Sequence, residues 1–327
     1  MKKVEQIEVG ADEGEVRLDR WLKRRARALT QGQIEKMLRT GQVRVDGARA
    51  KANDRLRAGQ IVRIPPLPEE RAPGGLSERD AAFAQSLVIH RDDDVIVLNK
   101  PAGLATQGGA KTLRHIDALL PALKFEKEEK PKLIHRLDRD TSGCLVLARH
   151  PRAAAALAKS FRTREAQKIY WAIVLGTPQP AAGQIRGWMH KAPGSAGREA
   201  DREMMRRCKQ NDEGAVFAVT DYVTLQRAGG KASWVAMKPE TGRTHQLRFH
   251  MAEIGNSILG DGKYTCDRPT PAGLANQLHL HARAIRLPHP TKGVLQASAE
   301  LPGHMKETMK ALGFDPREAK DPFEAFA

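Results

Sequence analysis

The stretch His135-Arg136-Leu137-Asp138-Arg139-Asp140-Thr141-Ser142-Gly143 leads directly into the apolar run Cys144-Leu145-Val146-Leu147-Ala148. Two carboxylates, two guanidiniums and an imidazole lie within six residues, at the entrance to a segment whose composition predicts a buried strand. Polar groups in such a place destabilise the fold unless they are paired, so their presence indicates a function. Asp138 is therefore the first candidate for a catalytic group.

A second dense polar stretch is Lys238-Pro239-Glu240-Thr241-Gly242-Arg243-Thr244-His245-Gln246-Leu247-Arg248-Phe249-His250. It follows an alternating strand, turns at Thr241-Gly242 and then enters a predicted helix. The N–H groups and positive potential of a helix start suit a phosphate or a carboxylate. One such segment is also explained by a capped helix with a solvated basic face, but two in one basic chain favour a functional role.

Composition narrows the class of protein. The chain has 327 residues, a net charge of +16 and three widely separated cysteines. Its length indicates two or three domains, and its charge favours a polyanionic partner, above all nucleic acid. No apolar run is long enough to span a membrane, the N-terminus has no signal-peptide pattern, and the cysteine spacing fits neither a disulfide framework nor a metal site. We therefore expect a cytoplasmic protein.

Most of the excess positive charge lies near the N-terminus. Between Arg17 and Arg63 there are fourteen Lys and Arg against four Asp and Glu. Helices near residues 16–22 and 33–39 and strands near 43–47 and 60–64 predict a small helix–helix–strand unit with a basic face. This unit resembles the S4 RNA-binding domain, with one departure: Thr30-Gln31-Gly32-Gln33 replaces the usual Ser-Arg, so one phosphate contact is missing or moved. The expected RNA contacts are Arg17, Lys23, Arg24 and Arg44.

The rest of the chain predicts a larger second domain. We expect the S4-like domain at residues 1–66, a proline-rich linker at 67–79 and a catalytic domain at 80–327. Strands in series with few helices between them predict an α+β fold, in which flanking helices pack on a mixed, largely antiparallel central sheet.

Metal and cofactor sites are not expected. Asp92-Asp93-Asp94 is interpreted as a solvated turn, and the glycine-rich loop at 99–109 lacks the phosphate-binding signatures of nucleotide sites. His279, His281 and His289 lack convincing ligand spacing and are interpreted as structural hydrogen-bonding groups. Cys144 is interpreted as an inert core thiol.

Several motifs in order resemble the RluA/RluC/RluD family of ribosomal RNA pseudouridine synthases. They include Asn99-Lys100-Pro101-x-Gly103, the stretch at 135–143, Lys168-x-Tyr170-x-Ala172, the stretch at 241–250, Gly260-Asp261-x-x-Tyr264 and Leu278-His279-Leu280-His281-Ala282. The resemblance covers about residues 15–312 and implies the pseudouridine synthase fold. It further implies a monomer acting on large-subunit (23S) ribosomal RNA or the assembling large subunit. The S4-like domain and the Arg139-Asp140 pair favour the C-type enzyme over the D-type.

The resemblance also implies roles for individual residues. Asp138 would be the catalytic carboxylate, Arg248 the cation that keeps it ionised, and Tyr170 a group that stacks on the target base or transfers a proton at C5. Arg136 would fill the space left by the flipped base, and Lys100, Arg243 and His245 would contact RNA. Whether Asp138 attacks the sugar, attacks the base or removes a sugar proton stays open.

Two other functions compete with this interpretation. A non-catalytic S4-containing assembly factor would not need Asp138, Tyr170 and Arg248 together. A hydrolase based on Asp138 would need a second carboxylate at a fixed distance, for which Asp140 or Glu240 would have to serve.

Overall fold

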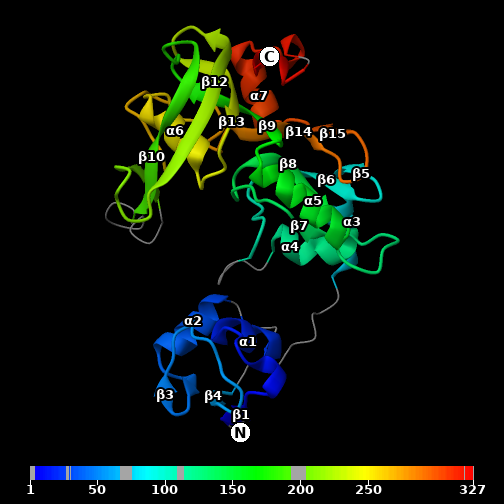
Figure 1. Cartoon of the computed structure of the whole chain (residues 1–327). Helices are drawn as coiled ribbons and strands as arrows, with labels where there is room; N and C mark the ends of the chain where they lie inside the picture. The colour runs from blue at the N-terminus through cyan, green and yellow to red at the C-terminus, as the bar shows by residue number, and fades with distance from the viewer. Residues whose placement is uncertain are drawn as a thin grey trace. The chain divides into compact units, whose positions relative to one another are not determined.

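The computed structural model describes residues 4–26, 29, 31–66, 76–108, 114–192, 204–319 and 321–326 (Figure 1). The chain forms two compact units. The first comprises Met1–Ser77 and Gly108–Leu113, and the second comprises Glu78–Gln107 and Arg114–Ala327. Most of the expected linker, residues 67–75, lies outside the described residues, and the domain boundaries expected from the sequence stay predictions.

The first unit packs two helices on a small antiparallel sheet. Its helical elements are η1 (Ala11–Glu13), α1 (Leu18–Arg25) and α2 (Gln31–Arg39). Its sheet has the order β1-β4-β2-β3, formed by β1 (Glu5–Glu8), β2 (Arg44–Val45), β3 (Ala48–Arg49) and β4 (Ile61–Ile64). Leu18, Trp21 and Leu22 are buried together in its core, as their helical spacing predicts.

The second unit is built on one large sheet. In the described residues it has eleven strands, ordered β11-β10-β12-β13-β9-β14-β8-β6-β5, with β15 paired to β14 and β7 to β8. Only β14 and β8 pair in parallel there. The predicted largely antiparallel sheet is confirmed. The strands are β5 (Val88–Arg91), β6 (Val95–Lys100), β7 (Lys132–Leu133), β8 (Ser142–Ala148), β9 (Gln167–Leu175), β10 (Ala182–Ala192), β11 (Met204–Arg207), β12 (Val216–Ala228), β13 (Ala232–Pro239), β14 (Leu280–Pro288) and β15 (Val294–Ser298).

Helices cover both faces of this sheet, in agreement with the predicted α+β class. Along β13, alternate residues face opposite sides, as a pleated strand requires. Val235 and Met237 pack with α6 (Gln246–Glu253), whereas Trp234 and Ala236 pack with α7 (Gly303–Leu312) (Figure 1). The remaining described helices are α3 (Glu78–Ser86), α4 (Ile116–Leu119), η2 (Leu120–Leu123), α5 (Pro151–Arg162), η3 (Pro316–Glu318) and η4 (Glu324–Phe326).

Strand β8 is an interior strand of the sheet. It lies between β14 and β6, and every one of its residues is buried. At its start, Gly143 has a φ of 109°, and a Cβ there would lie 2.2 Å from the carbonyl oxygen of Ala282. Only glycine therefore allows β14 to approach this closely. The polar stretch at 135–141 is carried at the end of a rigid, fully buried strand.

Candidate active site

A cavity of about 650 Å³ opens where the two polar stretches meet. Its walls come from four parts of the second unit. These are the segment at 135–141, the end of α5 with the start of β9, the segment at 238–248, and Leu280 of β14. Asp138, Tyr170 and Arg248, which are far apart in the sequence, all line it.

The loop after β6 holds Asp138 in place from both sides. The hydroxyl of Thr106 donates to the carbonyl of Leu137 at 2.7 Å and accepts from its N–H at 3.1 Å. On the other side, the ammonium of Lys100 donates to the carbonyl of Arg139 at 3.0 Å. The backbone on either side of Asp138 is thus anchored, while its side chain faces the cavity and keeps 24 % of its surface exposed.

Lys100 is not placed as an RNA contact. Its side chain is completely buried, and its ammonium donates to the carbonyls of Pro101, Leu104 and Arg139. Burial lowers the pKa of Lys100 to about 7, although Asp140 and Asp138 oppose this effect. The location contradicts the predicted RNA contact, because all three ammonium donors are used by backbone carbonyls. Lys100 instead supports the loop that carries Asp138.

Arg248 is oriented by a second carboxylate. Its Nε and Nη2 atoms donate to Asp261 at 2.7 and 2.6 Å, and the side chain of Asp261 is fully buried. Nη1 lies 4.0 Å from Oδ2 of Asp138. Burial acts to lower the pKa of Arg248, but Asp261 and then Asp138 outweigh it, so the guanidinium stays charged. A fork bound on one side to Asp261 presents its remaining nitrogen to Asp138.

His245 lies beside Asp138 as a neutral imidazole. Its Nε2 is 4.0 Å from Oδ2 of Asp138, and burial lowers the pKa of His245 to about 4 against the opposing effect of Asp138. Nδ1 is 2.9 Å from the hydroxyl of Tyr264, which accepts the N–H of Met205 at 2.8 Å. Tyr264 and Asp138 therefore lie at opposite nitrogens of the His245 ring. The expected RNA contact is thus placed at the carboxylate itself.

Tyr170 reaches the cavity from β9. Burial raises the pKa of its phenol, and the neighbouring charge of Asp138 adds to the effect. The phenol is therefore neutral near pH 7. A neutral ring suits stacking on a base or donating a proton, and it is poorly suited to removing one.

The loop between β13 and α6 is held by one side chain. Gln246 accepts from the N–H of Arg243 at 3.0 Å and donates to the carbonyl of Val219 at 2.8 Å, so it ties the loop to β12. Arg243 is exposed, lines the cavity and donates to the carbonyl of Phe217 at 3.1 Å. Arg136 is exposed at the opposite wall. Both positions are compatible with the predicted RNA contacts.

The expected contacts of the S4-like domain are exposed residues, and three of them have polar partners within the domain. Arg17 forms a bidentate pair with Asp19, and the ammonium of Lys23 donates to the carbonyl of Leu29. Arg24 is exposed. Arg44 is exposed and donates to the carbonyls of Gly41 and Gly47.

The predicted structural histidines and cysteine are placed as expected. His279 bonds to Thr308 at 2.8 Å, and His281 bonds to Ser142 at 2.8 Å. Burial lowers the pKa of each to about 4. Burial also raises the pKa of Cys144 to about 12, which makes its thiol unreactive.

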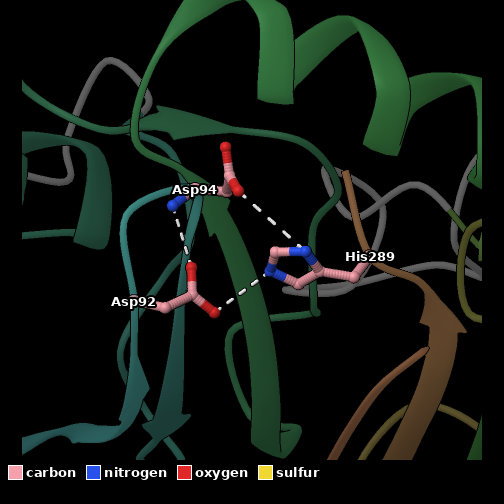
Figure 2. Close-up of side chains that lie close together, drawn as sticks. All are labelled: Asp92, Asp94 and His289. Carbon is pink, nitrogen blue, oxygen red and sulfur yellow. Dashed lines mark hydrogen bonds and ion pairs between the residues drawn. The ribbon is translucent and has the colours of Figure 1, made fainter. Parts of the chain in front are cut away.

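The turn at 92–94 meets His289 in a polar cluster (Figure 2). Asp92, Asp94 and His289 offer ligand atoms within 4.8 Å of one another. These atoms already have partners: His289 lies 3.1 Å from Asp92, which also bonds to His90, while Asp94 bonds to His150 and Thr291. The cluster is therefore a hydrogen-bonded clasp between the β5–β6 turn, the start of α5 and the β14–β15 turn. The turn is not simply solvated, because the side chain of Asp94 is only 9 % exposed.

Asp261 and Tyr264 are two residues of the site whose roles were not predicted from the sequence. Both lie in the motif Gly260-Asp261-x-x-Tyr264, which the sequence shows. The motif alone does not reveal that these side chains contact Arg248 and His245. A Cβ at Gly260 would lie 1.9 Å from the carbonyl of Gln277, so this turn also requires glycine.

Comparison with known proteins agrees with the fold and shows the family of the chain. Residues 94–253 match the RNA pseudouridylate synthase family, and residues 16–62 match the S4 domain. Among curated relatives, the large-subunit pseudouridine synthase C of Rickettsia conorii is 35% identical, covering 83% of this chain and 88% of that protein. The enzyme of the same name from Vibrio vulnificus is 32% identical, covering 95% and 97%.

A solved structure of a pseudouridylate synthase is also similar to this chain. Human RNA pseudouridylate synthase domain containing 4 superposes with a TM-score of 0.61 at 28% identity, covering 72% of this chain and 98% of that one. The chain belongs to the RNA pseudouridine synthase family and carries an S4 domain. It is an isomerase that converts uridine to pseudouridine in RNA. None of the described helices combines the length and apolar character that crossing a bilayer requires.

Proposed function

We propose that this enzyme isomerises specific uridines of large-subunit (23S) ribosomal RNA, with Asp138 as the catalytic carboxylate. The observation that carries the proposal is the convergence of Asp138, Tyr170 and Arg248 on one cavity from three distant segments. The relatives named for the large ribosomal subunit support the substrate, and the basic S4 domain supports a structured RNA. The enzyme works as a cytoplasmic monomer.

The reaction breaks the N1–C1′ bond of uridine and forms a C5–C1′ bond. N1 gains a proton and C5 loses one, so the reaction is redox-neutral and needs no cofactor. The target base must leave the helix stack, which costs a few kcal/mol. Arg136, exposed at the cavity wall, fills the vacated space.

Each group at the cavity has a distinct task. Asp138 reacts as a carboxylate, and the charged Nη1 of Arg248 lies 4.0 Å from its Oδ2 atom. His245 is neutral and places its Nε2 atom 4.0 Å from the same carboxylate oxygen. Tyr170 stacks on the uracil, and its neutral phenol is available as a proton donor.

The test is the isosteric variant Asp138→Asn. We expect it to form no pseudouridine in 23S rRNA that lacks the modification, while its affinity for the RNA stays within about threefold of wild type, since the phosphate contacts remain. Pseudouridine is mapped by sequencing the rRNA after chemical derivatisation. Full turnover by Asp138→Asn would show that the catalytic group has been misassigned.

The same assay separates the competing functions. Wild-type enzyme that binds rRNA without forming pseudouridine would be the non-catalytic assembly factor. Asp140→Asn and Glu240→Gln test the hypothesis of a hydrolase based on Asp138. Such a hydrolase requires a second carboxylate, which one of these two residues would have to supply. The pattern of modified uridines distinguishes C-type from D-type specificity.

A further inference from the structure

An aromatic pair lies on the strands next to the cavity loop. Trp21, Trp171 and Trp234 are at most 1 % exposed, whereas Trp188 of β10 is only partly buried. It stands opposite Phe217 of β12, with ring centroids 5.2 Å apart. Phe217 is 38 % exposed and is the one aromatic among the exposed large hydrophobic residues of the described chain. Apolar rings left in water favour a partner that covers them.

The pair lies on the sheet face opposite α6. On β10 and β12, Met189 and Ala218 point to the α6 side, where they pack with Tyr264 and Phe249. Trp188 and Phe217 alternate with them and point the other way. Further along β12, Val223 packs against the core beneath α7, but in the described chain that core includes neither ring.

Cations flank the pair on the same face. Arg186 lies two residues before Trp188, and Arg206 of β11 pairs in register with His190, two residues after it. Both arginines are exposed, and neither forms an ion pair with a described residue. On the adjacent loop, Arg243 donates to the carbonyl of Phe217 and also lines the cavity. Arg243 therefore links the backbone of the aromatic pair to the cavity wall.

We propose that Trp188 and Phe217 form a stacking platform for an unpaired nucleotide of the RNA strand that enters the cavity, with Arg186 and Arg206 binding its phosphates. The inference rests on the proposed function and extends it to a second RNA-binding surface. Every base presents a π-face to an aromatic side chain, and positive charge holds the backbone beside it. Flipping the target leaves neighbouring nucleotides unstacked, and these need a new surface.

The test measures binding of full-length protein to a 12-nucleotide single-stranded RNA and to a duplex of the same length. We expect Trp188→Ala and Phe217→Ala each to weaken single-strand binding about tenfold, with duplex binding and the salt slope unchanged. Trp188→Phe and Phe217→Tyr keep an aromatic ring and should bind like wild type. The double variant Arg186→Ala/Arg206→Ala should reduce the salt slope by about 1.4.

Val294→Ala is the matched control, because Val294 is 66 % exposed on β15 and lies outside the proposed surface. Thermal unfolding of each variant checks that it is folded. Alanine variants that bind the single strand within twofold of wild type would overturn the platform, and so would an equal loss of duplex binding. Wild-type protein that forms no pseudouridine in 23S rRNA would overturn the proposed function alone, because the binding comparison does not depend on turnover.

Discussion

At the scale of single residues, Asp261 decides how Arg248 is used. Two of the three guanidinium nitrogens are taken by Asp261, and the third faces Asp138 at 4.0 Å. A buried arginine with free rotation would instead pair directly with the Asp138 carboxylate. The bidentate contact keeps the positive charge close to Asp138 without consuming its lone pairs.

We predict that Asp261→Asn damages both stability and catalysis. Removing one partner leaves a buried, unpaired guanidinium, so the free energy of unfolding should fall by about 3–5 kcal/mol. Among molecules that stay folded, kcat should fall more than RNA affinity, because Arg248 becomes free to turn toward Asp138. Urea unfolding and single-turnover assays measure the two effects.

Asp315→Asn provides the control for this variant. Asp315 also forms a bidentate pair, with Arg317, but that arginine is 88 % exposed. An exposed pair contributes at most about 1 kcal/mol. Equal destabilisation by the two substitutions would mean that the Arg248–Asp261 pair has no special importance.

At the scale of elements, the sequence predicted strands better where their composition is uniform. The apolar run at 144–148 became β8, and the alternating segment at 232–237 became β13. β10 was not predicted, since Gly183 and Gly187 weaken its strand pattern. It forms because β12 offers it a continuous ladder, from Ala182 opposite Val223 to Met189 opposite Val216.

The clasp at the β5–β6 turn makes a prediction about pH. Burial acts to raise the pKa of Asp92, but hydrogen bonds from His90, from the amides of Asp94 and Val95 and from His289 lower it to about 2. A carboxylate whose pKa is lower in the folded state than its ordinary 3.8 stabilises the fold above that value. This stabilisation is lost as the pH falls toward 2.

Asp92→Asn should therefore be less stable than wild type at pH 6, by at most about 2 kcal/mol because the side chain is partly exposed. The difference should shrink between pH 4 and pH 2, as urea unfolding across that range would measure. Asp93→Asn is the control in the same turn, since the side chain of Asp93 is 90 % exposed. A difference from wild type that stays constant down to pH 2 would exclude the Asp92 carboxylate as its source.

At the scale of the whole molecule, we expect the two units to have different tasks, RNA binding in the S4 domain and the reaction in the second unit. The first unit has its own core around Trp21, and the second carries all the residues that line the cavity. Electrostatic affinity for RNA is therefore expected to reside largely in the basic first unit, and chemistry in the second.

Removing residues 1–66 tests this division. We expect the truncated enzyme to bind rRNA more weakly and with a flatter dependence on salt, since fewer counterions are released when fewer phosphates are contacted. Its turnover of bound RNA should change much less. Affinity measured between about 50 and 200 mM salt gives the slope, and an unchanged slope would remove the S4 domain from the RNA interface.

The sequence by itself determined the class of protein, the mixed sheet and the two polar stretches. Short motifs such as that at 135–143 combine strand composition with reactive groups, and both are local properties. It also identified His279, His281 and Cys144 as structural groups, because burial follows from the strands around them.

Only the tertiary structure decided which groups meet at Asp138. It buried Lys100 beneath the loop, bound Arg248 to Asp261, and placed neutral His245 between Tyr264 and Asp138. It also brought Trp188 and Phe217 together beside the loop of Arg243. The physical reason is that a side chain's charge, exposure and partners depend on segments distant in sequence, which approach one another only when the sheet is complete.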